Sequence, residues 1–222
     1  MQSLSHSEPL IGLPDSLSSS DFEQIFDEMS PNLLGLISVL SSSSPYVKHL
    51  IIKESLWLRG IINTDLSVAV SEILDDCRNS SLSDLATKLR CAKRRFNLLI
   101  LLADFGNLLS LSEVTEQLAA FAENITKIVI DLLVYHEFKK VDRKCFLTSF
   151  KHYPSNLSNA AARAGLITLA MGKLGSSELN YSSDIDLIFL FDEERYRPHD
   201  YSKIRKTFIN IIRKFVKILS EN

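Results

Sequence analysis

Apolar residues recur in steps of three and four along most of the chain before Tyr135, which is the spacing of one face of an α-helix. The two clearest runs, 81–104 and 110–135, predict two long helices. Gly106 and Asn107 interrupt the pattern between them and predict a short break. Two long helices joined in this way predict an antiparallel hairpin whose apolar faces bury each other.

Residues suited to helix starts support this interpretation. Ser44 followed by Pro45 predicts a helix start, because the hydroxyl can accept a free amide and proline fits the first turn. A further short helix is expected from Thr64, and together these helices predict a bundle over 21–137. A serine and an acid three residues apart open each long helix, namely Ser81 with Asp84 and Ser110 with Glu113.

The pattern changes after Tyr135. Residues 138–160 are polar and irregular and predict a connection. Two short apolar runs, 166–171 and 185–191, predict buried strands, and 202–220 predicts an amphipathic helix. Strand, turn, strand and helix form an α/β arrangement. The expected fold class is therefore α+β, with a mostly helical N-terminal bundle followed by an α/β domain.

This pattern divides the chain into three expected parts. Residues 1–20 are rich in serine and predict a disordered lead-in. Residues 21–160 hold the helical bundle and the connection, and 161–222 hold the first part of the α/β domain.

The charge balance favours neither a nucleic-acid partner nor a membrane partner. Lys and Arg total 25 and Asp and Glu total 27, which gives a net charge of -2. Basic residues nevertheless gather on the predicted helices 81–104 and 202–220. We interpret both groups as solvated outer faces, with contact to an acidic or phosphate-bearing partner as the alternative. The groups are Lys88, Arg90, Lys93, Arg94 and Arg95, and Lys203, Arg205, Lys206, Arg213, Lys214 and Lys217.

Several features predict a soluble cytoplasmic protein. The strongly apolar run 98–103 is far shorter than the roughly 20 residues that a membrane span needs. The first residues lack the pattern of a signal peptide. Cys77, Cys91 and Cys145 form no CxxC pair, which fits a reducing compartment. The histidines have no Cys or His partner at zinc-ligand spacing, so no structural zinc is expected.

The residues most suggestive of chemistry are Asp184 and Asp186, which open the second predicted strand. Side chains two residues apart on a strand share a face, about 6 to 7 Å apart at the backbone. Two carboxylates placed there next to a core repel each other and favour a bound cation. Mg²⁺, or Mn²⁺ in its place, suits carboxylate oxygens and substrate phosphates. Two such ions support in-line phosphoryl or nucleotidyl transfer.

Gly175 and Ser176, between the two predicted strands, supply a possible phosphate grip. Glycine lets the backbone approach a phosphate, and the amides of a turn opening a short helix, with the serine hydroxyl, can bind its oxygens. The segment matches neither the Walker A pattern nor GxGxxG. Each signal alone is common, and the simpler alternative is an acidic turn between strands.

Taken together and in order, these signals resemble a known family. The segment AMGKLGSSELNYSSDIDLIF is similar to the nucleotidyltransferase motif of the glutamine synthetase adenylyltransferase family, which has a polymerase-β-like fold. The matching blocks are Gly172–Gly175, Glu178–Asn180 and Ser182–Leu187. The helical stretch before them is similar more loosely.

The resemblance implies a reaction and its partners. Members of the family are large bifunctional enzymes, and Glu178–Ser183 resembles the N-terminal site, which removes AMP from adenylylated glutamine synthetase. That reaction is phosphorolysis, with inorganic phosphate consumed and ADP released, and it regulates nitrogen assimilation. A nitrogen-signalling regulatory protein is an expected partner of the full-length enzyme.

The resemblance also implies roles for residues. Asp184 and Asp186 would be catalytic and would hold Mg²⁺. Asn180 would help to orient the aspartates, and Glu178 matches the motif without an assigned role. The expected nucleotide- and phosphate-binding residues are Lys173, Gly175, Ser176 and Ser183, of which Ser183 is also expected to orient the aspartates and Lys173 has no assigned role beyond the motif match.

One departure from the family pattern changes the expectation of activity. The family carries a third carboxylate in an Arg-x-Asp-Leu-Arg segment, and no such segment follows the predicted helix 202–220 before Asn222. We therefore expect an incomplete sheet and a fragment with little activity alone. Two alternatives stay open. One is another nucleotidyltransferase of this fold, similar to a uridylyltransferase, and the other is an inactive remnant that only binds a partner.

Overall fold

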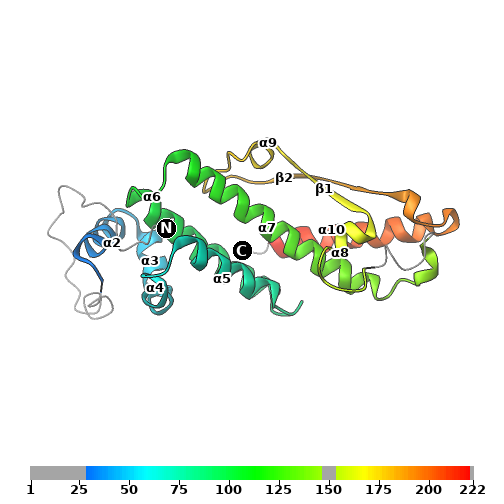
Figure 1. The fold of residues 1–222 in the computed structure, drawn as a ribbon, viewed down its shortest axis with the longest axis horizontal. Helices are drawn as coiled ribbons and strands as arrows, with labels where there is room; N and C mark the ends of the chain where they lie inside the picture. The colour runs from blue at the N-terminus through cyan, green and yellow to red at the C-terminus, as the bar shows by residue number, and fades with distance from the viewer. Residues whose placement is uncertain (1–28, 147–153, 221–222) are drawn as a thin grey trace. The chain divides into compact units, whose positions relative to one another are not determined.

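The computed structural model describes residues 29–146 and 154–220 (Figure 1). The lead-in predicted for 1–20 lies outside these residues. The described chain is mostly helical, with one two-stranded antiparallel sheet near its end. This agrees with the predicted α+β class.

The chain divides into two compact units, each described here by itself. Unit 1 comprises the described residues up to Asp76 together with Arg90–Gln117. Unit 2 comprises Cys77–Leu89 and the described residues from Leu118 onward. The boundary predicted near residue 160 stays a prediction.

Helices make up the chain before the sheet, close to where the apolar spacing predicts them. A short 3-10 turn, η2 (Arg143–Cys145), follows the last of these helices. The helices are α2 (Pro31–Ser43), α3 (Pro45–Lys53), α4 (Ser55–Ile61), α5 (Leu66–Arg78), α6 (Leu85–Phe105) and α7 (Leu111–Phe138).

The helix starts predicted at Ser44 and Ser110 are confirmed. The Ser44 hydroxyl accepts a hydrogen bond from the Val47 amide at 3.4 Å. At the start of α7, the Ser110 amide donates to Glu113 Oε2 at 2.7 Å, and the Glu113 amide donates back to the Ser110 hydroxyl at 3.4 Å. The bond from the Ser110 amide lowers the pKa of Glu113 below its usual value. Helix α6 begins four residues after its predicted capping serine.

A buried carboxylate joins α3 to α4 inside unit 1. Glu54 is 5% exposed, and its two oxygens bind the Nε atoms of Arg94 and Arg95, each at 2.9 Å. The Arg95 guanidinium also lies 4.9 Å from the centre of the Trp57 ring. The expectation that the basic residues of 81–104 form a solvated face is therefore wrong for these two arginines. They balance a buried charge instead.

Unit 2 continues with a short helix, the sheet and a final long helix. Strand β1 (Leu166–Met171) follows α8 (Ala160–Ala164), and β2 (Asp186–Phe191) follows α9 (Gly172–Gly175). The strands pair in a register that runs from Leu166 opposite Phe191 to Met171 opposite Asp186. Two 3-10 turns, η3 (Glu193–Arg195) and η4 (Pro198–Asp200), lead into α10 (Tyr201–Ser220).

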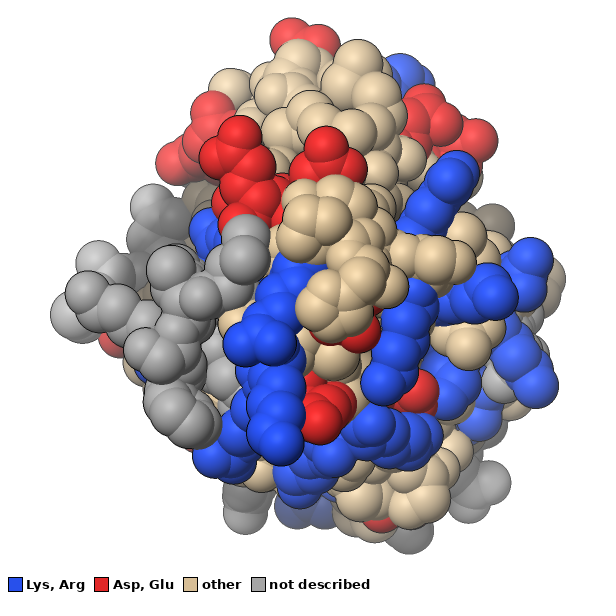
Figure 2. Space-filling model, turned by 90° about the vertical axis from the view of Figure 1, so that its right-hand side faces the viewer, with Lys and Arg blue, Asp and Glu red and all other residues tan. Residues whose placement is uncertain are grey.

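Helix α10 covers one face of this sheet. Its Phe208 and Phe215 rings lie 5.1 Å from Phe191 and 5.5 Å from Phe189. The opposite side of α10 carries its charges. Figure 2 views the molecule from the end at which α10 begins, and Lys and Arg side chains gather in the lower and right-hand parts of that view. The buried residues of α10 are Ile204, Phe208, Ile211 and Phe215, as the spacing predicts.

The prediction that both strands are buried is wrong for the other face of the sheet. Successive side chains of a strand point to opposite faces, and α10 covers only one of them. The residues on the uncovered face are 43–50% exposed; they are Ile167, Leu169, Met171, Ile188 and Leu190.

A buried tyrosine ties the segment after α7 to the one after β2. Phe146 pairs with Tyr196 in an isolated antiparallel bridge, and their rings lie 4.8 Å apart. The Tyr196 hydroxyl donates to the Ala164 carbonyl at the end of α8. Burial raises the pKa of Tyr196, so the hydroxyl keeps its proton and remains a donor.

None of the helices within the described residues combines the length and the apolar character needed to cross a bilayer.

Candidate functional site

The register of the sheet brings the two ends of the motif together. Met171, the last residue of β1, lies opposite Asp186, the first residue of β2. Gly172 follows directly with φ +56°, and a Cβ placed on it would lie 3.5 Å from Asp186 Oδ2. The positive φ would strain any other residue here, and a Cβ would be in ordinary van der Waals contact with the carboxylate. The start of the Gly-Lys-Leu-Gly block and the Asp-Ile-Asp block therefore lie next to each other.

The two aspartates are more open than expected. The strand begins at Asp186, so Asp184 lies in the irregular segment before it and the alternation rule does not place both on one face. Both side chains are exposed, and neither makes a hydrogen bond or ion pair with the described residues. Water screens exposed charges, so these two carboxylates do not require a bound cation. This corrects the expectation that was based on a buried strand. Their oxygens are nevertheless free to bind one.

The expected phosphate grip at Gly175 and Ser176 has a different geometry. Helix α9 ends at Gly175 rather than opening there. The amides of Ser176 and Ser177 donate to the carbonyls of Gly172 and Leu174, at 3.1 and 3.2 Å. They are therefore already used within the turn. The prediction of a helix that opens with free amides at this point is wrong.

The Ser176 hydroxyl is also engaged, although it lies at the surface. Its oxygen lies 3.3 Å from the Gly172 and Lys173 carbonyls and 3.2 Å from Glu178 Oε2. A hydroxyl has one hydrogen and can exchange such exposed partners for a phosphate oxygen. Glu178, whose role the motif leaves open, thus lies against Ser176.

Gly175 has a packing role that the sequence does not show. A Cβ on this residue would lie 2.6 Å from the Ala170 carbonyl oxygen. Only glycine lets α9 close against the end of β1, which keeps Gly172 beside Asp186.

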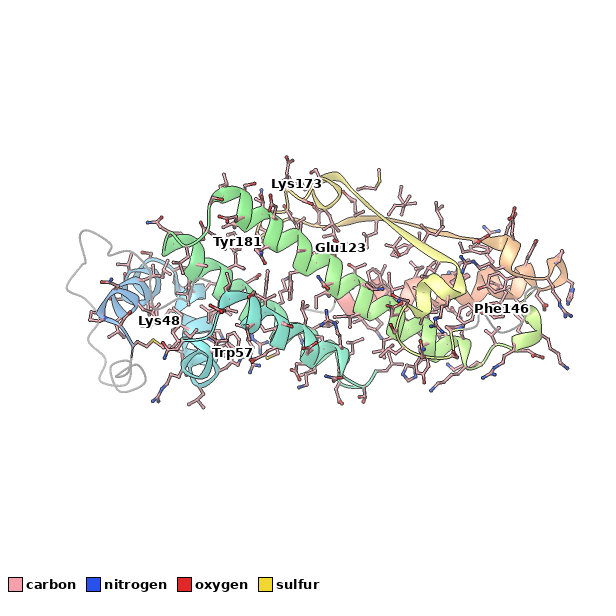
Figure 3. All side chains as sticks on the ribbon, in the orientation of Figure 1. Lys48, Trp57, Glu123, Phe146, Lys173 and Tyr181 are labelled. Carbon is pink, nitrogen blue, oxygen red and sulfur yellow. The ribbon has the colours of Figure 1, made fainter. Side chains whose placement is uncertain are left out.

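The remaining expected residues lie around this turn. Lys173 is exposed on α9 (Figure 3), and its side-chain ammonium has no partner among the described residues. The Ser183 hydroxyl accepts from the Asn180 amide at 3.3 Å, which closes the turn just before Asp184. Ser183 and Asn180 therefore shape the backbone that leads to Asp184, without bonding its carboxylate.

Sequence reasoning missed a buried acid that positions the sheet. Asp131 of α7 is 6% exposed; its Oδ1 accepts from the Ala161 amide at 2.9 Å and its Oδ2 from Lys127 Nζ at 3.1 Å. Lys127 also donates to Asn159 Oδ1 at 2.8 Å. These bonds hold the start of α8, which leads directly into β1. The available signal was one acid inside the apolar run 128–134.

A cavity of about 400 Å³ lies beneath the sheet, bordered by α7, α8 and α9. Thr168, Ala170 and Leu187 line it from the strands. Leu187 and Asp186 are adjacent on β2 and point to opposite faces, so the Asp186 carboxylate faces away from this cavity.

The donor set fits magnesium in kind. Mg²⁺ commonly uses one or two carboxylates and completes its shell with water and substrate phosphates. Asp184 and Asp186 supply such carboxylates at the surface. Within residues 29–146 and 154–220, no cluster of three or more His, Cys, Asp or Glu side chains is placed to hold a metal. Other ligands would have to come from outside these residues, for example from water or substrate.

Comparison with known proteins shows to which family the sequence of the chain is similar. Residues 34–222 match the family model of glutamate-ammonia ligase adenylyltransferase. Similar proteins are named bifunctional glutamine synthetase adenylyltransferase/adenylyl-removing enzyme. The one from Bartonella quintana (strain Toulouse) is 30% identical over 83% of this chain, and the one from Brucella suis biovar 1 (strain 1330) is 31% identical over 83%. The one from Rhizobium meliloti (strain 1021) is 36% identical over 63%.

The matched segments are small parts of those relatives. They cover 19% of the Bartonella protein, 18% of the Brucella protein and 13% of the Rhizobium protein. The chain thus spans less than a fifth of the length of the relatives that it matches.

Proposed function

Because the chain belongs to the glutamate-ammonia ligase adenylyltransferase family, we propose that it carries part of the site that removes AMP from adenylylated glutamine synthetase. The observation that carries the proposal is the surface at which Gly172, at the start of α9, lies next to the Asp186 carboxylate. The order of the motif, with Glu178–Ser183 between the strands, resembles the N-terminal site of the family and favours the removing half.

The proposed reaction is phosphorolysis of a phosphodiester. An oxygen of inorganic phosphate attacks the phosphorus that joins AMP to a tyrosine of the substrate. The bond from phosphorus to the tyrosine oxygen breaks, the new P–O–P bond makes ADP, and the proton of the phosphate passes to the tyrosine oxygen. The transition state carries negative charge on its phosphoryl oxygens, so groups that balance this charge accelerate the step.

Different residues of the chain would bind the metal ion and the phosphate. Asp184 and Asp186 would hold Mg²⁺, which would neutralise charge on the phosphoryl oxygens when bound. The Ser176 hydroxyl and the Lys173 ammonium would bind phosphate oxygens from α9. Gly172 places the start of α9 next to Asp186. Glu178 lies 3.2 Å from the Ser176 hydroxyl and would orient it.

The direct test measures labelled ADP. Adenylylated glutamine synthetase is incubated with the chain, Mg²⁺ and radiolabelled inorganic phosphate, and ADP is separated by chromatography. The expected product is a small amount of labelled ADP, in keeping with the little activity expected of this chain alone, and Asp186→Asn removes it. The matched control is Glu193→Gln, an exposed acid of η3 outside the site, and it should keep activity. Release of AMP instead of ADP would contradict phosphorolysis.

A second function is favoured by one observation. The described residues offer two carboxylates rather than a cluster of three, which suits a chain that binds glutamine synthetase without catalysis. This binding module would yield no ADP at any Mg²⁺ concentration, yet would bind the adenylylated protein in calorimetry. If a longer version that includes the Arg-x-Asp-Leu-Arg segment then released ADP, the chain would be an inactive part of an active enzyme. The third possibility, a uridylyltransferase-like enzyme, is disfavoured by the family match over 34–222.

Ser176 provides a narrower test. Ser176→Ala should weaken phosphate binding, measured by calorimetry, while changing the free energy of unfolding by less than about 0.5 kcal/mol, because its bonds are exposed. Ser182→Ala, at another exposed serine of the motif, is the control. Equal phosphate affinity in the two variants would remove Ser176 from the site.

A further inference from the structure

Helix α10 concentrates positive charge in a chain whose net charge is -2. It carries six Lys and Arg residues and no Asp or Glu along Tyr201–Ser220. The buried side of the helix packs on the sheet, so these cations occupy the exposed side. We call this exposed side the basic face; its cations are Lys203, Arg205, Lys206, Arg213, Lys214 and Lys217.

Most of these cations have no side-chain partner among the described residues. Lys214 binds Glu137 Oε1 at 2.7 Å, and Lys217 has an interaction of its own. Within the described part of the chain, the other four cations of the basic face make no ion pair or hydrogen bond through their side chains. The six like charges do not stabilise the helix itself, because like charges at i and i+4 destabilise it slightly.

Neighbouring segments extend the positive surface at the start of α10. The Arg197 amide donates to the Cys145 carbonyl at 2.9 Å, so Arg197 lies beside η2. Arg143 and Lys144 of η2 are exposed there, and Figure 2 shows this end of the molecule with its Lys and Arg side chains gathered together. Cations that converge from separate segments create a field that attracts an acidic partner.

Two aliphatic side chains lie within the basic face and indicate the class of partner. Ile209 is 40% exposed and Val216 is 54% exposed. They are seven residues apart, so they share one side of the helix, and Arg205 and Arg213 lie four residues on either side of Ile209. Apolar side chains within a charged rim are typical of protein interfaces. A surface for single-stranded nucleic acid would instead offer aromatic side chains for stacking, and α10 exposes none in full.

A membrane partner fits less well. An amphipathic helix binds a bilayer through its apolar face, and the apolar face of α10 is buried against the sheet. Ile209 and Val216 alone provide little surface for insertion.

We propose that the basic face of α10 is a docking surface for another protein, one that presents acidic side chains around a small aliphatic patch. Arg205 and Arg213 pair with its carboxylates, and Ile209 and Val216 contact its aliphatic side chains. The surface lies on the side of α10 away from the sheet that carries Asp186. This inference does not depend on the proposed reaction.

The test uses the full chain and a defined probe. The probe is a fluorescein-labelled helical peptide of 20 residues, the length of α10, with Leu on one face and Glu on both flanks. Its binding is followed by fluorescence anisotropy. Arg205→Glu with Arg213→Glu should weaken binding by about tenfold or more, and added salt should weaken binding to the parent chain. Ile209→Ser with Val216→Ser should weaken it by a smaller factor, with less dependence on salt.

A matched control separates this surface from charge in general. Lys48→Glu with Lys53→Glu makes the same charge change on the exposed side of α3, and should leave binding unchanged. Arg205→Gln with Arg213→Gln repeats the test without new negative charge, and circular dichroism verifies that each variant is folded. Equal losses in the α10 and α3 variants would overturn the proposal. So would tighter, Arg205-dependent binding of a single-stranded oligonucleotide or of phosphatidylserine vesicles, because either would assign the basic face to another class of partner.

Discussion

Glu54 of unit 1 and the aspartates of the unit 2 motif use their carboxylates in opposite ways. In unit 1, Glu54 is buried and both of its oxygens bind arginines. In unit 2, Asp184 and Asp186 are exposed and bind nothing among the described residues. A buried charge must be compensated, whereas an exposed charge can stay free at little cost. The first arrangement fixes a junction between helices, and the second leaves oxygens available for a ligand.

Asp131 shows that the difference follows burial rather than the unit. It lies in unit 2, close to the sheet, yet it resembles Glu54 because it is buried and its two oxygens are bonded. Acids that are buried and have both oxygens bonded are therefore those that hold elements of the fold in place. Exposure without a partner, next to Gly172, identifies the acids offered for chemistry.

The largest expected effect is at Glu54. Glu54→Gln leaves Arg94 and Arg95 without a balancing charge, and should lower the free energy of unfolding by about 2 to 3 kcal/mol. The arginines are 28% exposed and can partly turn to water, which keeps the loss below that of a fully buried pair. Urea denaturation measures it. Glu72→Gln, at an exposed position of α5, should change stability by less than about 0.5 kcal/mol, and an equal loss there would contradict the comparison.

Asp131 should give the next largest effect. Asp131→Ala removes the acceptor for the Ala161 amide and for Lys127, and should lower the free energy of unfolding by about 2 kcal/mol. Hydrogen exchange should become faster in 160–166, because the start of α8 loses its anchor. Lys127→Met, which removes only the more exposed partner, should cost less. Unchanged exchange in this segment would show that Asp131 does not position the sheet.

Glu137 tests an intermediate case through pH. Burial raises its pKa, but hydrogen bonds from Lys214 and Lys140 outweigh this and hold the pKa below the usual 4.5. The folded state therefore binds the proton more weakly than the unfolded state, so the contribution to stability is full above 4.5 and is lost as the pH falls through the folded pKa.

Glu137→Gln should thus lower the free energy of unfolding at neutral pH by less than about 1 kcal/mol. The difference from the parent chain should vanish as the pH falls below 4.5, followed by urea denaturation at a series of pH values. A difference that grows in acid would have the wrong sign and would exclude this account.

The smallest effect on stability is expected at the exposed aspartates. Asp184→Asn with Asp186→Asn should change the free energy of unfolding by less than about 0.5 kcal/mol, because neither carboxylate has a partner among the residues that the structure describes. The same variant should lose Mn²⁺ binding in calorimetry. Glu193→Gln with Glu194→Gln, two exposed acids of η3, should keep it. Mn²⁺ affinity that is the same in both variants would remove the aspartates from a metal site.

Local features of this fold were predictable from the sequence because their causes are local. Ser44 and the Ser110–Glu113 pair cap their own helices, and the apolar steps from 111 to 135 follow the period of one helix. The six residues of β1 were predicted with their bounds unchanged. The surroundings of these elements were less predictable, since an apolar run does not reveal that only one of its faces will be covered.

The candidate site also has features that the sequence predicts and features that it does not. The residues of the site and their order along Gly172–Asp186 are given by the sequence, and the sequence motif alone is enough to connect them with a family. Which of them meet depends on the pairing of Met171 with Asp186, on α9 closing over Ala170, and on Asp131 holding α8 from 30 residues away. Hydrogen bonds and pairing between distant segments are made only when the chain is folded, so tertiary structure alone decided which carboxylates became buried supports and which were left free in water.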